Sequence, residues 1–250
     1  MVDVTCNGSE FALLCAIIKI FFGYFAFNMK PVFKRVLVVV LLFAVAMTLR
    51  YFYLVNKNEA LPIINPADIK SKEFISDSLA QIKSNHIIRD FQLINQNGDT
   101  ITQLVFKNKI YIANFFFASC KTICPNMNGG LQTVYDEYQG DSSVCFISHS
   151  SLPLEDSVPV LKAYSARFGA QLPQWQFVTG NKKEIYDLAR NFYLMAETKN
   201  EGLEYDFIHS RYLALIDTHK RIRGYYDGTS TDDVSKLIED IAMLKKENIK

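Results

Sequence analysis

The stretch FFFASCKTICPNM, residues 115–127, contains two cysteines separated by three residues, Cys120 and Cys124. In a helix this spacing places two side chains on one face. Pro125 fits best in the first turn of a helix, where its missing N–H is not needed. We therefore expect Cys124 at the start of a helix and Cys120 on the loop before it, with converging sulfurs. Two such thiols can bind one soft metal ion or oxidise to a disulfide.

A buried strand is expected to position this pair. The apolar run KIYIANFFF, residues 109–117, predicts a strand covered on both faces, and it leads directly into the cysteines. Residues 127–139 then show helical spacing of apolar side chains. Open α/β sheets bind ligands where a strand ends and a helix begins. Free backbone N–H groups at such a junction are expected to lower thiol pKa values and favour thiolates.

The chain from His86 onward alternates strands with helices. A hairpin is expected around Asn97-Gly98, and Asn181 has the position of a helix N-cap. The other expected elements are strands over 143–150, 175–180, 211–217 and 221–229, and helices over 156–170, 181–193 and 231–250. This order predicts an α/β sandwich with a central mixed sheet over residues 86–250.

The first 55 residues differ in composition from the rest. Two apolar runs, 11–27 and 36–49, flank the basic segment MKPVFKR, residues 29–35. The second run predicts an uncleaved transmembrane helix, because no small-residue cleavage site follows it. The basic segment is then expected on the cytoplasmic side, with the later residues across the membrane. Residues 1–55 are therefore interpreted as a membrane anchor of one or two apolar helices, since Met29 could itself begin a signal anchor.

Residues 56–85 are polar and are predicted to form a linker, with one short helix near 70–82. The 250 residues carry a net charge of +1, which argues against nucleic acid as a partner because no long basic face is implied. Five cysteines are too few for a disulfide scaffold.

A metal site would need a further ligand, because two sulfurs rarely suffice. The chain has four histidines. His86 and His219 are expected to be exposed, and His149 is expected to pack at the end of a core strand. His209 stands just before the strand 211–217, after a polar loop. The residues themselves leave a metal clamp and a redox couple equally open.

Residues 86–247 resemble the Sco/SenC family of thioredoxin-like copper proteins. The motifs that carry the resemblance are ANFFFASCKTICPNM, SHSSLPLEDSVPVLKAYSARFGA, WQFVTG, HSRYLALID and RIRGYYDGT. The resemblance implies a membrane-anchored, thioredoxin-like domain that binds one copper, as Cu(I) or Cu(II), through Cys120, Cys124 and His209. It also implies a part in building the dinuclear copper centre of cytochrome c oxidase subunit II. Two departures are Ile208, where many members have Asp, and SSLPLEDS in place of a VDPE-like segment.

Three functions are compatible with these motifs. The first is copper delivery with little turnover of its own, the second is a thiol–disulfide oxidoreductase that keeps partner cysteines reduced, and the third is a peroxidase-like redoxin. In thioredoxin-like folds the loop opposite the cysteines normally carries a proline, and here His209-Ser210 favours the first function. The CxxxC spacing also differs from the CxxC of thioredoxin oxidoreductases. The expected location is the periplasmic side of a bacterial inner membrane, in preference to a mitochondrial one.

Overall fold

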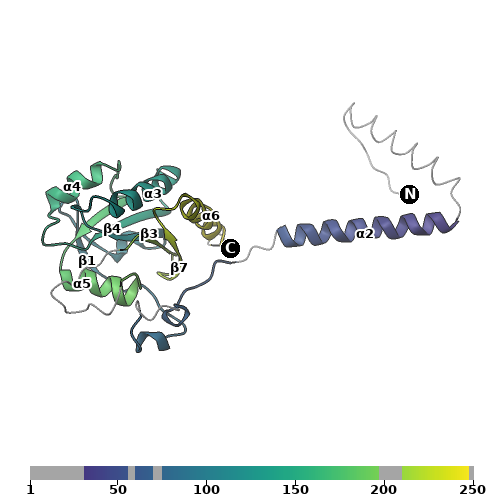
Figure 1. The fold of residues 1–250 in the computed structure, drawn as a ribbon, viewed down its shortest axis with the longest axis horizontal. Coiled ribbons are helices and arrows are strands. Elements are labelled where there is room, and N and C mark those ends of the chain that lie inside the picture. Colours follow the sequence, from purple (N-terminus) through teal and green to yellow (C-terminus); the bar gives the residue numbers. More distant parts are fainter. Residues whose placement is uncertain (1–30, 56–59, 70–74, 197–209, 248–250) are drawn as a thin grey trace, which may run out of the picture. The chain divides into compact units, whose positions relative to one another are not determined.

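The computed structural model describes residues 31–55, 60–69, 75–196 and 210–247, which form parts of two compact units, Met1–Glu59 and Ala60–Lys250 (Figure 1). In the first unit, helix α2 spans Pro31–Val55 and exposes apolar side chains such as Val39 and Phe43. Within the described residues no helix has the length and apolarity required to cross a membrane. The transmembrane prediction for 36–49 is thus not confirmed, and the run 11–27 lies outside the described residues.

The second unit contains a mixed sheet of seven strands in the order β2-β1-β5-β4-β3-β6-β7, which confirms the predicted fold class. The strands are β1 Gln92–Asn95, β2 Thr100–Thr102, β3 Ile110–Phe116, β4 Val144–Ser150, β5 Trp175–Thr179, β6 Tyr212–Ile216 and β7 Ile222–Asp227. The neighbours β3, β4 and β5 are parallel, and the other pairs are antiparallel. Every residue of β3 and β4 is buried, as expected for central strands of a sheet that is covered on both faces.

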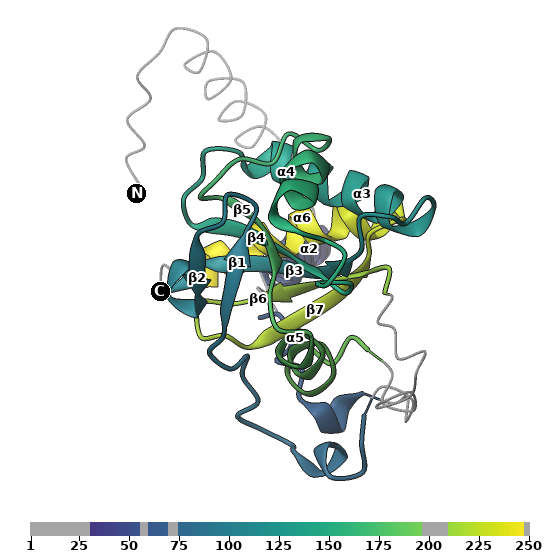
Figure 2. The ribbon, with the colours of Figure 1, turned by 90° about the vertical axis from the view of Figure 1, so that its left-hand side faces the viewer.

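Helices cover both faces of the sheet (Figure 2). The helices are α3 Ile123–Tyr138, α4 Val158–Ala166, α5 Lys182–Asp187 and α6 Thr231–Glu247, with a π-helical turn η4, Leu188–Phe192, after α5. Side chains of α3, α4 and α6 pack in one core, and those of α5 and η4 pack in the other. Alternation along β3 divides its residues between the cores, so that Phe116 faces α3 and Phe115 faces α5.

Short sequence motifs predicted the local structure correctly where that structure depends on a single segment of the chain. The predicted N-cap Asn181 accepts hydrogen bonds from the backbone N–H groups of Lys183 and Glu184 at 2.9 and 3.3 Å. The predicted hairpin is present, with β1 and β2 antiparallel and Gly98 at a φ of +88°. Part of the short helix expected near 70–82 lies outside the described residues, and the described part, from residue 75, contains the 3-10 turn η2 Leu79–Gln81. Two other 3-10 turns are η1 Pro66–Asp68 and η3 Gln103–Phe106.

The segment predicted as a linker belongs largely to the folded unit, which begins at Ala60 rather than at His86. The backbone N–H of Ile64 donates to the carbonyl of Ile222 at 2.8 Å, so residues near 64 pair with the edge strand β7. Ile64 and Ile69 pack against the core on the α5 side. Composition does not reveal that Leu61, Ile64 and Ile69 pack against the cores, because these contacts are with segments far away in the sequence.

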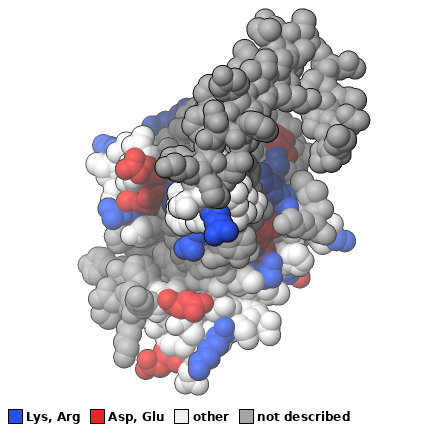
Figure 3. All heavy atoms as spheres, turned by 90° about the vertical axis from the view of Figure 1, so that its right-hand side faces the viewer, with Lys and Arg blue, Asp and Glu red and all other residues white. Residues whose placement is uncertain are grey.

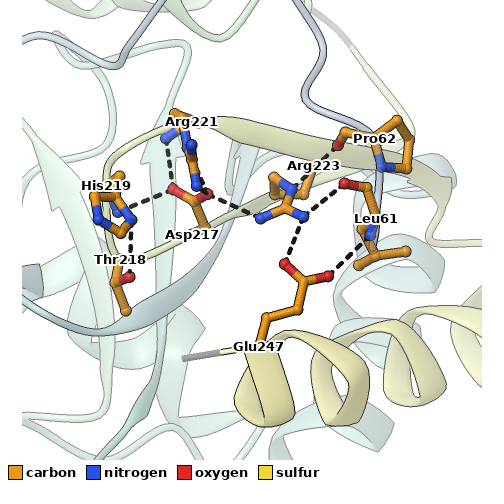
Figure 4. A network of polar contacts seen from close by, with 8 residues as sticks. All are labelled: Leu61, Pro62, Asp217, Thr218, His219, Arg221, Arg223 and Glu247. Atoms are coloured by element: carbon orange, nitrogen blue, oxygen red, sulfur yellow. Dashed lines mark hydrogen bonds and ion pairs between the residues drawn. The ribbon is translucent and has the colours of Figure 1, made fainter. Parts of the chain in front are cut away.

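Arg223 on β7 holds this segment and the end of α6 together (Figure 4). Its side chain is 4% exposed. The guanidinium donates to Asp217 at 3.0 Å, Glu247 at 2.7 Å, the carbonyl of Leu61 at 2.6 Å and the carbonyl of Pro62 at 3.1 Å. The group of residues 61, 62, 217, 223 and 247 is called the Arg223 clamp below.

Charges of both signs are interspersed on the described surface in the view of Figure 3. Pairs such as Lys220 with Asp90, 3.1 Å apart, join neighbouring loops at the surface. Exposed pairs of this kind contribute at most about 1 kcal/mol each, because water and salt screen them. The stability of the unit therefore depends on its two cores and on buried polar contacts such as the Arg223 clamp.

Candidate metal centre

The two cysteines lie where β3 passes into α3, as the spacing predicted. Cys120 is on the loop, and Cys124 is the second residue of α3, which begins at Ile123. The backbone N–H of Cys124 donates to Sγ of Cys120 at 3.4 Å, and the two thiols also interact directly. Cys120 is partly exposed and Cys124 is 3% exposed. One thiol is therefore open to solvent while the other lines the core behind it.

The two thiols differ in acidity, whereas the sequence predicted lower pKa values without distinguishing them. For Cys120, burial raises the pKa, but hydrogen bonds from the N–H groups at the start of α3 outweigh it and bring the pKa below its usual value. For Cys124, burial raises the pKa to about 12, and the neighbouring Cys120 and Asp156 add to the effect. Burial of Cys124 depends on how α3 packs, which the local motif does not reveal.

A buried polar network sets the rotation of α3 beneath the thiols. Asn114 on β3 donates through Nδ2 to Oδ1 of Asn128 at 2.8 Å. Asn128, one helical turn after Cys124, donates in turn to the hydroxyl of Tyr164 on α4 at 3.2 Å. Both asparagines are fully buried. Because a buried amide without partners is costly, this network allows α3 only one orientation, and Cys124 is placed accordingly.

His209 lies outside the described residues, so its role as a ligand stays a prediction. The strand that follows it, β6, begins at Tyr212 and runs antiparallel to β3, with Ala113 opposite Ala214. The start of β6 is consequently at the sheet edge where β3 ends and the cysteines follow. Among the described residues no group of three or more His, Cys, Asp or Glu could hold a metal ion. Within this part of the chain the thiol pair supplies two ligands for a soft metal.

Two of the other histidines agree with their predictions and one does not. His219 is exposed, and His149 is fully buried in the core on the α5 side, away from Cys124. The prediction that His86 is exposed is wrong. It is 7% exposed, because its Nε2 lies 2.8 Å from the carbonyl oxygen of Phe192 at the end of η4, a residue far away in the sequence.

We expect His149 to make the folded unit sensitive to acid. Its ring stacks on Phe115 with centroids 4.7 Å apart, and Nδ1 lies 3.2 Å from the carbonyl oxygen of Asn114. Burial lowers its pKa from 6.5 to about 4. Between these values the unfolded chain takes up a proton that the folded chain does not, so stability falls as the pH falls. The loss approaches about 3 kcal/mol near pH 4.

Urea unfolding at pH 7.0, 5.5 and 4.5 checks this expectation. His149→Phe cannot take up the proton and should show a flatter decline of the free energy of unfolding over this range. His219→Phe, at an exposed position, is the control and should follow the wild-type curve. Equal slopes for His149→Phe and the wild type would contradict the assignment.

Asp156, which the sequence did not single out, lies within the same region. It is 2% exposed and stands on the loop between β4 and α4. The backbone N–H of Ala118 donates to its two carboxylate oxygens at 3.3 and 3.2 Å, and the hydroxyl of Ser150 donates at 2.6 Å. Burial raises the pKa of this carboxyl group. An acid two residues before a helix is usually a surface residue, so the sequence carried no signal of this burial.

These features define the class of the protein. It has a thioredoxin-like fold: helices cover both faces of a mixed β-sheet, and a cysteine pair lies where a central strand meets its helix. Within that class the chain belongs to the SCO1/SenC family, whose family model matches residues 79–246.

Individual relatives agree with this assignment. The chain is 27% identical over 165 residues to the "SCO1 protein homolog" of Bacillus subtilis, covering 64% of this chain and 85% of that protein. It is also similar to the solved structure of BsSco, at 25% identity and a TM-score of 0.56 over 65% of this chain and 95% of that chain. BsSco is described as a member of the Sco family of cytochrome c oxidase assembly proteins in which a disulfide switch was identified. The copper-bound structure of Bradyrhizobium japonicum ScoI shares the fold at 24% identity and a TM-score of 0.51, over 64% of this chain and 98% of that chain.

Proposed function

We propose that this protein binds one copper ion through Cys120, Cys124 and His209 and delivers it during assembly of the dinuclear copper site of cytochrome c oxidase subunit II. The observation that carries the proposal is the thiol pair at the start of α3, with Cys124 N–H on the Cys120 sulfur, in a chain of the SCO1/SenC family. Copper is bound in one solved relative, and another is described as belonging to a family of oxidase assembly proteins.

The donor set suits a soft ion. Two thiolates and a neutral imidazole offer Cu(I) three soft or borderline ligands, whereas Cu(II) would favour a further ligand such as water or a carboxylate. Thiols must lose their protons to bind, and Cys124, with a pKa of about 12, is protonated at neutral pH. Copper binding therefore releases at least one proton, and the apparent affinity should rise about tenfold per pH unit near pH 7. Oxidation of the pair to a disulfide removes both thiolates and should abolish binding.

An anaerobic Cu(I) titration of the reduced full-length protein against a competing chelator tests the proposal. The wild type should bind one tight equivalent. His209→Ala should weaken binding by about 10-fold or more, since it leaves a two-coordinate site. His219→Ala removes an exposed imidazole and should bind as the wild type does. An unchanged affinity in His209→Ala would remove His209 from the ligand set, and no tight equivalent in the wild type would overturn copper delivery.

A thiol–disulfide oxidoreductase is the second candidate, and the difference in acidity between the two thiols favours it. The exposed, more acidic Cys120 could attack a disulfide of a partner, and the buried Cys124 could then displace that partner from the mixed disulfide. In this exchange the partner disulfide gains two electrons and two protons, and the pair Cys120–Cys124 becomes a disulfide. The same pair could serve both functions, because each requires reduced thiols.

Alkylation rates measure this difference between the thiols. At pH 7 iodoacetamide should modify Cys120 at least about tenfold faster than Cys124, because only the thiolate reacts and only Cys120 is accessible. Cys120→Ser should therefore lose the fast phase, and Cys124→Ser should keep it. Peptide mapping by mass spectrometry identifies the modified residue. Equal rates at the two positions would contradict the assigned roles.

We also propose that the N-terminal unit attaches the protein to a membrane, with the folded unit on the periplasmic side. The support is the row of exposed apolar side chains along α2, including Val39, Phe43 and Leu49, since such side chains are stable in contact with lipid. Extraction of cell membranes at alkaline pH tests the attachment: the protein should stay with the membrane pellet. Its release into the supernatant would contradict a hydrophobic anchor.

A further inference from the structure

The β4–α4 loop is bound to the end of β3 at two successive points. The backbone N–H of Ser151 donates to the carbonyl of Phe116 at 2.7 Å, and the hydroxyl of Ser151 reaches the same oxygen at 3.1 Å. Two residues after Phe116, the backbone N–H of Ala118 donates hydrogen bonds to the carboxylate of Asp156. The loop 117–122 that carries Cys120 is thus fixed at its start by a residue from another part of the chain.

The carboxylate of Asp156 is itself held in place. Ser150 donates its hydroxyl to Oδ2 at 2.6 Å, and the same hydroxyl oxygen accepts the N–H of Leu152 at 3.1 Å. The N–H of Asp156 donates to the carbonyl of Leu152 at 2.9 Å, which closes the turn. Among the described residues these partners are N–H and O–H groups, so the carboxylate acts as a hydrogen-bond acceptor rather than as one half of an ion pair.

Asp156 and Cys124 are anchored to neighbouring backbone N–H groups. The N–H of Phe117 hydrogen-bonds to the Cys124 thiol, and the next N–H along the chain, that of Ala118, donates to Asp156. A shift of Ala118 would move the N–H of Phe117 off the sulfur and displace Cys120, which is two residues further on. The carboxylate also acts on Cys124 through its charge.

We propose that Asp156 is a positioning residue for the thiol pair: by holding the N–H of Ala118, it keeps the sulfurs of Cys120 and Cys124 in the arrangement that binds a soft cation or closes a disulfide. The part of this inference that concerns copper rests on the proposed function, and the part that concerns the disulfide does not. Groups that orient metal ligands in this way typically change metal affinity 10- to 100-fold when they are removed.

The test compares three variants of the full-length protein. Asp156→Ala removes the acceptor, Asp156→Asn keeps an oxygen that can accept the N–H of Ala118, and Glu155→Gln removes one charge from an exposed neighbouring position. Two readouts are used for each: Cu(I) affinity against a chelator, and the equilibrium with reduced and oxidised dithiothreitol in the absence of metal. In that equilibrium the protein disulfide gains two electrons and two protons from dithiothreitol, which becomes the cyclic disulfide.

Asp156→Ala should bind Cu(I) at least about 10-fold more weakly. Its disulfide should also be about 10-fold easier to reduce, a shift of about 30 mV to less negative potential, because loosely held sulfurs form a weaker disulfide. Asp156→Asn should recover most of both values, and Glu155→Gln should match the wild type. If Asp156 merely stabilised the fold, Asp156→Ala would unfold at a lower temperature, but the reduction potential of its disulfide would be unchanged.

Several outcomes separate this inference from the proposed function. A wild-type potential in Asp156→Ala would overturn the positioning role even if copper binds. If Asp156→Asn is as impaired as Asp156→Ala in both readouts, the positioning role is also overturned, because the charge of the carboxylate would then be the cause. A wild-type protein that binds no Cu(I), together with a shifted potential in Asp156→Ala, would overturn copper delivery and leave the positioning role supported.

Discussion

Arg223→Met is expected to lower the free energy of unfolding by about 4 kcal/mol, because it breaks a buried ion network and leaves its partners unpaired. Asp217 is 1% exposed and would lose one of its cationic partners. The carbonyl oxygens of Leu61 and Pro62 would lose their donors, and Glu247 would lose its ion pair. The segment that starts the folded unit would then detach more easily from the edge strand β7.

Thermal and urea unfolding of the full-length protein measure this effect, with an expected drop of the unfolding temperature of roughly 10 °C. Arg221→Met is the matched control. Arg221 also contacts Asp217, at 2.7 Å, but its side chain is 32% exposed, so water can replace it and the expected loss is about 1 kcal/mol. Similar losses in the two variants would show that the Arg223 clamp stabilises no more than a surface pair does.

Gly130→Ala is expected to be the most damaging small substitution near the thiols. Gly130 lies on α3, and a Cβ atom there would be 2.1 Å from the carbonyl oxygen of Gly228 and 3.0 Å from a methyl group of Val234. The first of these is a backbone atom and cannot turn aside. The helix that carries Cys124 would have to move away from the β7–α6 turn, at a cost of about 4 kcal/mol or more.

Gly129→Ala provides the control in the adjacent position. A Cβ atom at Gly129 would meet nothing within 4 Å, and alanine is a better helix former than glycine by roughly 0.5–1 kcal/mol. The two neighbouring substitutions should thus have opposite signs in urea unfolding. If Gly130→Ala folds with wild-type stability, α3 does not approach Gly228 as closely as the structure indicates.

Repeating the alkylation experiment on these glycine variants connects stability to the site. In Gly130→Ala, displacement of α3 should expose Cys124 and reduce the difference in rate between the two thiols. Gly129→Ala should leave the difference unchanged. A preserved difference in a destabilised Gly130→Ala protein would show that the start of α3 is held independently of its middle, as the network of Asn114, Asn128 and Tyr164 would allow.

The amino-acid sequence by itself determined the elements around the site. The mostly apolar sequences of β3 and β4 predict strands that are covered on both faces. Pro125 and the CxxxC spacing place Cys124 in the first turn of α3, and the family motifs extend over most of the folded unit. These predictions succeeded because each depends on residues that are close together in the chain, where periodicity and backbone preferences act.

Only the tertiary structure decided which groups the fold buries. The high pKa of Cys124, the burial of His86 and Asp156, and the start of the unit at Ala60 all depend on contacts between distant segments. Arg223 and Pro62 are hydrogen-bonded although 161 residues separate them. Burial sets the cost of a charge or an unpaired polar atom, and burial is a property of the packed chain rather than of any local pattern. For that reason the thiols could be found in the sequence, but their unequal acidity and the carboxylate that holds their loop could not.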